Sequence, residues 1–292
     1  MTGPGPRLSV VIPAFNEAGY LSAALASLQR QDFRGGYEVI VVDNNSTDDT
    51  AAVARRHGAR VVHEPQPGVC AARQRGTEAA HGEIVVSTDA DTVHPPGWLS
   101  RLDAQFTQHP EAMAVAGPCR YVDPPWWAAV FPPLWFAAVA LAYACFGRIF
   151  YVTATNIAFV RDRFPGYDTT LTQGGDEMDL LRRLRRRGRV VWDARNPVAT
   201  SSRRMDQGLL HTLFVSFGYY YALSYLLNRM TSRTVLGAAP AIRQQHAEQV
   251  RRLRWRWRAG LLAGAAALAG WAWVRSDVAL TLTALTQLLL RR

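Results

Sequence analysis

Four short apolar runs in the first ninety residues, separated by segments with helical character, constrain the fold of this chain more than any other feature. The runs are residues 8–12, 38–42, 60–63 and 83–87. After the first run, Leu21, Leu25 and Leu28 recur at the spacing of one buried helix face, and residues 51–57 follow a polar turn as a second helix. Strands that are apolar throughout and alternate with helices are typical of a mostly parallel sheet covered on both faces. The sequence therefore predicts an α/β fold.

Acidic residues follow two of these runs. Asp43 comes directly after the second run, and Asp89 and Asp91 come after the fourth. Ligands of such sheets bind beyond the C-terminal ends of the strands, and alternate residues of a strand point the same way, so Asp89 and Asp91 are expected to project together. Paired carboxylates suit a hard divalent cation that also binds substrate phosphates. A solvated turn is the competing interpretation of so short a pattern.

The basic residues indicate a lipid partner. The chain of 292 residues has a formal net charge of +10, and all 33 of its basic residues are Arg. They gather at residues 182–189, 203–204 and 251–258. We find no nucleic-acid-binding motif, and the last cluster adjoins apolar sequence. We therefore expect an anionic membrane surface, and no nucleic acid, as the partner.

Three apolar segments favour membrane association. Residues 126–146 are uncharged, but Pro132 and Pro133 within them favour an interfacial or partly buried helix over a membrane span. Residues 209–227 resemble an amphipathic helix at an interface, with a helix of the protein core as the alternative. Residues 259–290 are apolar apart from Arg275 and Asp277 at their centre, which predicts a hairpin whose Arg-rich ends stay in the cytoplasm. A pair of packed soluble helices is the alternative to this hairpin.

These segments divide the chain into two predicted parts. Residues 1–205 form the expected α/β domain, and residues 206–292 form a membrane-associated helical region. No signal-peptide pattern occurs at the N-terminus, and Cys70, Cys119 and Cys145 form no Cys-x-x-Cys pair, so we expect three buried free thiols in a reducing compartment. The expected location is the cytoplasmic face of the cell membrane.

Five motifs occur in a fixed order within residues 8–204. They are Val-Val-Ile-Pro-Ala-Phe-Asn-Glu at 10–17, Val-Val-Asp-Asn-Asn-Ser-Thr-Asp-Asp-Thr at 41–50, Ala-Arg-Gln at 72–74, Asp-Ala-Asp at 89–91, and Thr-Asn-Ile-Ala-Phe at 155–159, which leads to Gly-Gly-Asp-Glu-Met-Asp-Leu at 174–180. Each motif is weak alone, but in this order they resemble the family 2 glycosyltransferases with the A-type nucleotide-sugar-binding fold (GT-A). The resemblance implies a GT-A fold and a nucleotide-sugar donor.

The resemblance also implies roles for the donor site. Asp91 would hold a divalent metal, Mg²⁺ or Mn²⁺, and Asp89 would bind the ribose or the same metal. Asp43 would recognise the nucleobase, Arg73 would contact the nucleotide, and Arg203 would close over the diphosphate. The remaining residues expected to line this nucleotide-sugar pocket belong to the first loop: Pro13, Ala14, Phe15 and Glu17.

The base of the family comes from a Glu-Asp pair at the start of a helix, and here the order is reversed. Alignment on Asp179 places Glu177 at the base position, but Asp176 could equally deprotonate an acceptor hydroxyl, so the choice stays open. A phosphate acceptor, already ionised, would need the pair much less. Gln74 stands where the family commonly has Asn, and a Gln-x-x-Arg-Trp motif is absent, which argues against a processive polysaccharide synthase.

The expected function is a metal-dependent, inverting transfer of a sugar from a UDP- or GDP-sugar to an amphiphilic acceptor in the bacterial cell envelope. A polyprenyl phosphate and a glycolipid both fit the acceptor. One alternative is a membrane-tethered transferase with a soluble acceptor, and another is a non-catalytic subunit that binds nucleotide sugar. A nucleotidyltransferase would normally carry a Gly-rich basic loop after the first strand, where this chain has residues 13–17.

Overall fold

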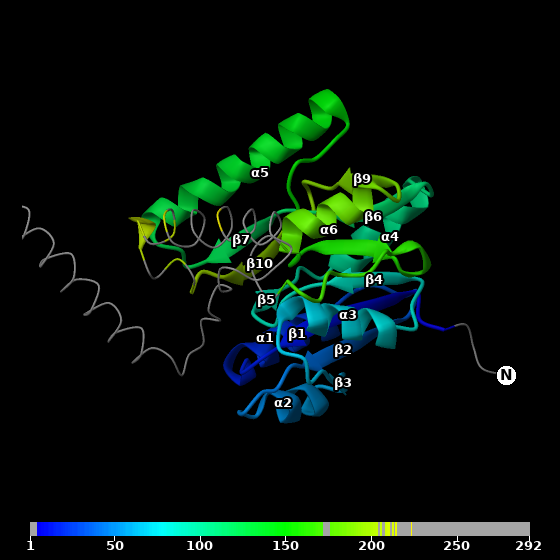
Figure 1. Cartoon of the computed structure of the whole chain (residues 1–292), viewed down its shortest axis with the longest axis vertical. Helices are drawn as coiled ribbons and strands as arrows, with labels where there is room; N and C mark the ends of the chain where they lie inside the picture. The colour runs from blue at the N-terminus through cyan, green and yellow to red at the C-terminus, as the bar shows by residue number, and fades with distance from the viewer. Residues whose placement is uncertain are drawn as a thin grey trace, which may run out of the picture. The chain divides into compact units, whose positions relative to one another are not determined.

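The computed structural model describes residues 5–171 and 176–203, together with Met205, residues 208–210, Thr212, Phe214 and Leu223. Its main sheet has seven strands in the order β3-β2-β1-β4-β8-β6-β9 (Figure 1). These strands are β1 Leu8–Ala14, β2 Tyr37–Asp43, β3 Arg60–His63, β4 Ile84–Ser87, β6 Ala112–Ala116, β8 Ile157–Val160 and β9 Arg189–Trp192. Only β8 runs antiparallel to its two neighbours, so the predicted mostly parallel sheet is confirmed.

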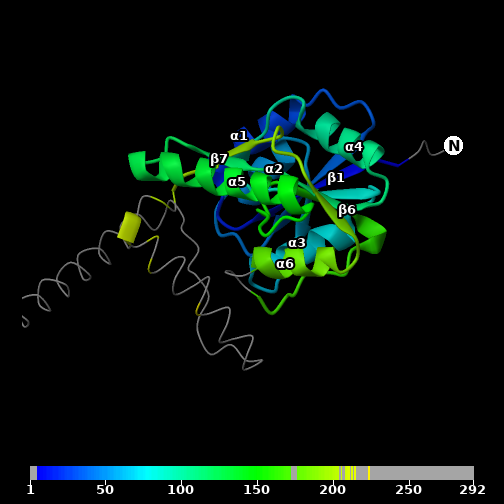
Figure 2. The ribbon, with the colours of Figure 1, turned by 90° about the horizontal axis from the view of Figure 1, so that it is seen from above.

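Helices cover both faces of this sheet. They are α1 Ala18–Gln29, α2 Thr50–Arg56, α3 Val69–Ala79, α4 Trp98–Gln108, α5 Trp126–Phe146 and α6 Asp176–Arg185. Seen from above, α1 and α4 lie on one side of the strands, and α3 and α6 lie on the other (Figure 2). Six of the seven residues of β1 are buried, as its apolar sequence predicts for a central strand. The four strands and two helices expected in the first ninety residues are confirmed.

A small second sheet carries part of the site. It has the order β5-β10-β7, where β5 is Thr92–Val93, β7 is Cys119–Val122 and β10 is Val198–Ser201. Thr200 pairs with Thr92, and the Ser201 amide donates to the Asp91 carbonyl at 3.2 Å. This pairing brings the C-terminal end of β10 beside the turn that holds Asp91.

Helix α3 packs unusually close to the sheet at Gly76. A Cβ atom at this position would lie 2.3 Å from Cγ1 of Val11 and 2.9 Å from Cγ2 of Val42, so a larger residue would push the helix away. Gly76 therefore sets the depth of α3. Arg73 lies one turn earlier on the helix, toward the C-terminal edge of β1, and its position depends on this depth.

Helix α5 continues through Pro132 and Pro133 without interruption and ends at Gly147, which has a left-handed φ of 64°. The ring of Phe136 stacks on Trp192 of β9 with centroids 5.8 Å apart, which attaches the helix to the main sheet. Much of the remaining surface of the helix is exposed. Cys145 is exposed on it, so the expectation that all three cysteines are buried is wrong for this residue, while Cys70 and Cys119 are buried.

Several sequence predictions fall outside the described residues. They are the C-terminal hairpin of residues 259–290, the basic cluster at 251–258, most of the apolar segment 209–227, the glycines at 174 and 175, and Arg204. The boundary between residues 205 and 206 stays a prediction. Within the described residues, α5 is long and apolar enough to cross a membrane by length and composition alone.

Candidate functional site

The loops that follow β1 and β2 are joined into one surface at the C-terminal edge of the sheet. Asn16 and Asn45 have left-handed φ values of 55° and 67°. Oδ1 of Asn16 accepts from the Thr47 amide at 2.7 Å, and the Asn16 amide donates to Oγ of Ser46 at 3.0 Å. The two loops are therefore held at a fixed separation. Pro13, Ala14 and Phe15, expected to line a nucleotide pocket, lie on the first loop or at the end of its strand.

Asp43 occupies the matching position on the second strand. It ends β2 and pairs in register with Ala14 of β1. Its Oδ1 accepts from the Ser46 amide at 3.1 Å, which orients the carboxylate within the turn. The next residue, Asn44, accepts from the Gly68 amide at 2.8 Å and so fixes the start of α3 against this edge. The structure thus brings Asp43 to the first loop, as the sequence predicts.

Asp89 and Asp91 do not belong to a strand. β4 ends at Ser87 and β5 begins at Thr92, so both carboxylates lie in the turn between them. The expectation that the alternation of side chains along a strand makes the two carboxylates project together is therefore wrong, because neither residue is in a strand. The two carboxylates also have different partners. Asp89 contacts Arg73 and Asp91 contacts Arg203. Both still lie beyond the C-terminal end of a buried strand.

A buried arginine connects the Asp-x-Asp turn to helix α6. Nη2 of Arg73 lies 2.9 Å from Oδ1 of Asp89, and Nη1 lies 3.0 Å from Oδ2 of Asp176. The second oxygen of Asp89 accepts from Oγ1 of Thr155 at 2.7 Å. Burial alone would lower the pKa of Arg73, but the charges of Asp89 and Asp176 outweigh it and hold the pKa above its ordinary value. This guanidinium therefore stays charged and fixes both carboxylates.

Glu177 is the next residue on α6 and has a different environment. Its Oε2 accepts from the Tyr151 hydroxyl at 2.7 Å, and its Oε1 accepts from the Ala154 amide at 3.0 Å. Burial and then the neighbouring charge of Asp176 raise the pKa of Glu177 to about 7, against the opposing effect of the two hydrogen bonds. A carboxylate that titrates near neutrality is suited to accept a proton during a reaction.

Arg203 lies between two other acidic residues. Its guanidinium donates to both oxygens of Glu17, at 2.8 and 2.7 Å, and lies 2.9 Å from Oδ2 of Asp91. It also lies over the ring of Tyr20, 4.8 Å from the centroid. Glu17 is buried, so this pairing compensates its charge. The Arg-containing loop thus reaches the first loop, where the sequence places the nucleotide.

The residues around Asp91 fit a metal ion that is shared with substrate. Among the described residues, no three His, Cys, Asp or Glu side chains are grouped closely enough to hold a metal alone. A magnesium-type ion commonly takes one or two carboxylates and completes its shell with substrate phosphates and water. Asp91 supplies one such carboxylate, and the Arg203 guanidinium shows that a positive group is accommodated there.

Four residues of this site carry no assignment from the sequence. Thr155 is the first residue of the Thr-Asn motif, and this membership could have identified it as a site residue. Its hydroxyl donates to Asp89. Tyr20, Tyr151 and Thr200 had no such signal, because each reaches the site from a separate segment. Oγ1 of Thr200, for example, lies 3.4 Å from Oδ1 of Asp91 only because β10 pairs with β5.

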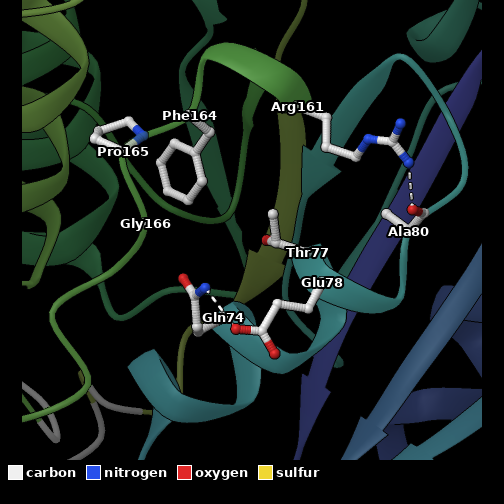
Figure 3. A pocket seen from close by; sticks show the side chains of 8 residues that line it. All are labelled: Gln74, Thr77, Glu78, Ala80, Arg161, Phe164, Pro165 and Gly166. Atoms are coloured by element: carbon white, nitrogen blue, oxygen red, sulfur yellow. Dashed lines mark hydrogen bonds between the residues drawn. The ribbon is translucent and has the colours of Figure 1, made fainter.

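A separate hollow lies on the outer side of α3. Its volume is about 460 Å³, and it is lined by Gln74, Thr77, Glu78, Ala80, Arg161, Phe164, Pro165 and Gly166 (Figure 3). Oε1 of Gln74 accepts from the Tyr167 amide at 2.9 Å, so this departure from the family pattern supports a neighbouring loop. The lining includes none of the predicted site residues. The candidate site therefore stays at the C-terminal edge of the sheet and not in this hollow.

Curated relatives match about a third of the chain. An uncharacterized glycosyltransferase of Mycobacterium tuberculosis is 47% identical over 102 residues, which are 35% of this chain and 44% of that protein. A GalNAc(5)-diNAcBac-PP-undecaprenol beta-1,3-glucosyltransferase of Campylobacter jejuni is 36% identical over 104 residues, 33% of each chain. The matched part is thus less than half of the length of these relatives.

Solved structures share the fold. A mannosyltransferase from Pyrobaculum calidifontis in complex with GDP-Man and Mn²⁺ has a TM-score of 0.56 at 24% identity, covering 68% of this chain and 58% of its own. Glucosyl-3-phosphoglycerate synthase from Mycobacterium tuberculosis, with Mn²⁺, UDP-glucose and phosphoglyceric acid, has a TM-score of 0.50 at 27% identity, covering 70% and 74%. These likenesses confirm the expected fold.

The family is established by a match that includes most of the site. Residues 9–160 match the model described as glycosyl transferase family 2, and this range contains the two donor-side loops, Arg73 and the Asp-x-Asp turn. Glu177 and Arg203 lie beyond it, joined to it by the contacts with Tyr151 and Glu17. With this match over more than half of its length, the chain belongs to glycosyl transferase family 2.

Proposed function

We propose that this chain transfers a sugar, with inversion, from a nucleoside diphosphate sugar to a hydroxyl of a membrane-associated acceptor. The observation that supports this most directly is the Glu177 carboxylate, held by Tyr151 and Ala154 and raised in pKa to about 7. A base with this property is needed to deprotonate a neutral hydroxyl at physiological pH. Glu177 is therefore the proposed base, and Asp176, which pairs with Arg73, is a positioning residue.

The proposed donor site is the surface formed by the loops after β1 and β2. Asp43 would accept from an N–H group of the nucleobase, with Pro13, Ala14 and Phe15 beside it. Asp89 would face the ribose, and Arg73 would keep this carboxylate in place. Arg203 would exchange its contact with Asp91 for the diphosphate, because a guanidinium binds phosphate oxygens as a matched pair of donors.

The reaction would be a single displacement at the anomeric carbon. The acceptor oxygen forms the new bond to this carbon while its proton passes to Glu177. The bond between the anomeric carbon and the diphosphate oxygen breaks, and the leaving nucleoside diphosphate takes the electron pair. Arg203 lies two residues after the end of β10, where it can approach the charge that develops on the leaving group.

A divalent cation at Asp91 would neutralise part of the charge on the diphosphate. The two solved relatives named above contain Mn²⁺ with their nucleotide sugars, which supports a metal without choosing between Mg²⁺ and Mn²⁺. One of those structures contains GDP-mannose and the other UDP-glucose, so guanosine and uridine donors both stay within the proposal.

A membrane location at the cytoplasmic face is supported by helix α5. The helix has no charged residue, and Trp126 and Phe146 at its ends are 82% and 78% exposed. Arg189, the first residue of β9 and the last of the basic cluster at residues 182–189, donates to the Tyr143 hydroxyl at 3.1 Å, so this end of the cluster lies next to the C-terminal part of α5. Apolar and aromatic side chains beside a basic cluster are suited to an anionic bilayer surface.

The acceptor class is proposed from this surface and from one relative. The Campylobacter jejuni protein is named for an undecaprenol-linked acceptor. The Mycobacterium tuberculosis synthase was solved with phosphoglyceric acid, which is soluble and favours the alternative of a soluble acceptor. We prefer the lipid-linked acceptor because of the exposed apolar side chains of α5. A non-catalytic binding subunit would not need a carboxylate that titrates near neutrality.

The test is transfer by purified full-length protein in the presence of a membrane lipid extract. A panel of radiolabelled UDP- and GDP-sugars is supplied with Mn²⁺, with Mg²⁺, or with chelator. We expect one donor to label the lipid fraction in a metal-dependent way. No binding or turnover of any donor would reject the proposed function.

Asp91→Asn is the matched variant for the metal, since it keeps the size of the side chain and removes its charge. It is expected to lose metal-dependent transfer while keeping its melting temperature within a few degrees. Glu111→Gln, an exposed carboxylate that pairs with Arg189 outside the site, is the control for removing an acidic charge. Equal activity of Asp91→Asn and Glu111→Gln would contradict a role for Asp91.

A further inference from the structure

A buried histidine lies directly behind the Asp-x-Asp turn. This residue, His94, follows β5, and Thr88 precedes the first aspartate of the turn. Nε2 of His94 lies 2.8 Å from Oγ1 of Thr88, so a single contact joins the two ends of the segment that carries the Asp-x-Asp pair. Thr88 is fully buried and His94 is 4% exposed. The contact therefore closes the turn from the protein interior.

The hydrogen-bond partners of His94 determine which of its ring nitrogens carries the proton. Oγ of Ser27 donates its only hydrogen to the Ala24 carbonyl at 2.6 Å. The same oxygen lies 3.0 Å from Nδ1 of His94 and accepts from the His94 amide at 3.1 Å. Because Ser27 has no second hydrogen to donate, Nδ1 must be the donor. In the neutral ring, Nε2 then accepts from the Thr88 hydroxyl.

The neutral ring is the form that the surroundings of His94 favour. Burial lowers the pKa of His94 to about 3, against the opposing effect of the Asp89 charge. The imidazole therefore carries no charge near physiological pH, and its two hydrogen bonds keep the same direction throughout that range.

His94 is connected to Asp89 by a second route. Its ring stacks on Trp98 of α4 with ring centroids 4.1 Å apart. Nε1 of Trp98 donates to Oδ1 of Asn156 at 2.9 Å. The residue before Asn156 is Thr155, whose hydroxyl donates to Asp89 at 2.7 Å. One imidazole thus contacts the residue that precedes Asp89 and supports a side chain that binds its carboxylate.

We propose that His94 is a positioning residue of the metal and donor site, which holds the Asp-x-Asp turn in one geometry from the protein interior. This inference rests on the proposed function, in which Asp91 holds a divalent metal and Asp89 faces the ribose. The contact of Asp91 with Arg203 is expected to change when the diphosphate binds. The bond between His94 and Thr88 is buried, so it can keep the turn in place during that exchange.

A core histidine that only fills space is the competing interpretation, and two variants of His94 distinguish it from a positioning residue. The side chain of Gln can place an acceptor oxygen where Nε2 lies, so His94→Gln keeps an acceptor for Thr88. The side chain of Asn is shorter and reaches only the Nδ1 position, so His94→Asn keeps the donor to Ser27 and loses the acceptor. Both variants remove the ring that stacks on Trp98. A role in packing alone would therefore affect metal binding equally in the two variants.

The first experiment titrates Mn²⁺ alone into purified full-length protein and follows free Mn²⁺ by electron paramagnetic resonance. Thr88→Val removes the hydroxyl and keeps the shape of the side chain. It is expected to raise the Kd for Mn²⁺ about tenfold, the lower end of the range for groups that orient a metal ligand.

The His94 variants complete this titration. His94→Asn is expected to raise the Kd as much as Thr88→Val does, and the double variant no further, because all three lack the same bond. His94→Gln is expected to have a Kd close to that of the wild type. Equal Kd values for His94→Asn and His94→Gln, or a wild-type Kd for Thr88→Val, would overturn the positioning role.

Tyr37→Phe is the matched control for the loss of a hydroxyl. The Tyr37 hydroxyl donates to the Leu28 carbonyl of α1 at 2.7 Å, and Tyr37 begins β2 at the end opposite to Asp43. Its melting temperature is expected to fall about as much as that of Thr88→Val, with no change in the Kd for Mn²⁺. If this control weakened Mn²⁺ binding to the same extent, the effect would be one of general stability and the inference would be overturned.

The second experiment is independent of metal and donor. ¹⁵N NMR of the full-length chain labelled at histidine reports which ring nitrogen carries the proton, and the His94 signals are those absent from His94→Gln. We expect the form protonated at Nδ1. The form protonated at Nε2 would overturn the inference even if the chain transfers sugar. Failure of the wild type to bind Mn²⁺ or to turn over any donor would instead reject the proposed function itself.

Discussion

The Tyr151 hydroxyl donates a hydrogen bond of 2.7 Å to Oε2 of Glu177, from a segment that follows the most apolar helix of the described chain. The other oxygen of Glu177 accepts from the Ala154 amide at 3.0 Å. Both bonds favour the ionised carboxylate, while burial and the charge of Asp176 oppose it. The proton affinity of Glu177 is thus a balance that single substitutions can move in either direction.

The first prediction concerns the pH dependence of transfer. A base must be ionised to accept a proton, and burial with the Asp176 charge raises the pKa of Glu177 to about 7, so kcat is expected to rise with pH through this value. Glu177→Gln should lower kcat by about 10²–10⁴-fold at pH 8. Donor affinity, measured by calorimetry, should be unchanged. A flat pH profile from pH 5.5 to pH 8.5 would contradict a general base.

Tyr151→Phe should move this profile to higher pH. The variant removes a hydrogen bond that lowers the pKa of Glu177, so the ionised form appears only at higher pH. A hydrogen bond to a charged group contributes about 1.5–3 kcal/mol, which corresponds to roughly one pH unit or more. The measurement is kcat against pH beside the wild type, and an identical profile would show that the bond does not act on the base.

Asp176→Asn should move the profile in the opposite direction. Its charge raises the pKa of Glu177, and an amide of the same shape removes that charge while its oxygen can still accept from Arg73. The acid limb of kcat is therefore expected at lower pH than in the wild type. If Asp176 were itself the base, this variant would lose activity at every pH.

Arg73→Met should destabilise the fold as well as the site. Asp176 is buried and would lose the guanidinium that compensates it, and removing one partner of a buried ion pair costs about 3–5 kcal/mol. Unfolding in guanidinium chloride, monitored by circular dichroism, measures this loss in the free energy of unfolding. Arg60→Met is the control, because Arg60 pairs with Glu38 at the surface and its loss should cost less than about 1 kcal/mol.

Arg203→Gln should tighten the binding of Mn²⁺ to protein without nucleotide. The guanidinium lies 2.9 Å from the Asp91 carboxylate, so a cation that binds there must displace it. Removal of this competing charge is expected to lower the Kd for Mn²⁺ about tenfold, equivalent to about 1.4 kcal/mol, in an electron paramagnetic resonance titration. Weaker Mn²⁺ binding would place Arg203 outside any competition with metal.

Local sequence was sufficient for the first half of the fold. The runs at β1 and β4 are almost wholly apolar and buried, and a strand buried on both faces needs little else to be identified. The antiparallel direction of β8 could not be predicted in this way. Its residues 157–160 carry no sign of direction, which depends on pairing with β4 and β6 far away in the chain.

The sequence predicts the residue types of the site better than it predicts which of these side chains contact each other. Asp43 and the Asp-x-Asp pair follow strands, so their edge of the sheet could be predicted from position alone. The contact between Arg73 and Asp176 joins residues 103 positions apart, and no local pattern encodes it. The sequence also left open which of Asp176 and Glu177 is the base. Only their long-range partners, Arg73 and Tyr151, distinguish the two carboxylates.

The ion pair between Glu17 and Arg203 spans 186 positions of the chain. During synthesis the two residues leave the ribosome far apart in time, so the first loop exists for most of that period without the Arg203 guanidinium. A nascent chain that stops before Arg203 therefore has every described strand of both sheets but lacks one residue of the proposed donor site. Capture of nucleotide would then report that translation had passed the end of β10.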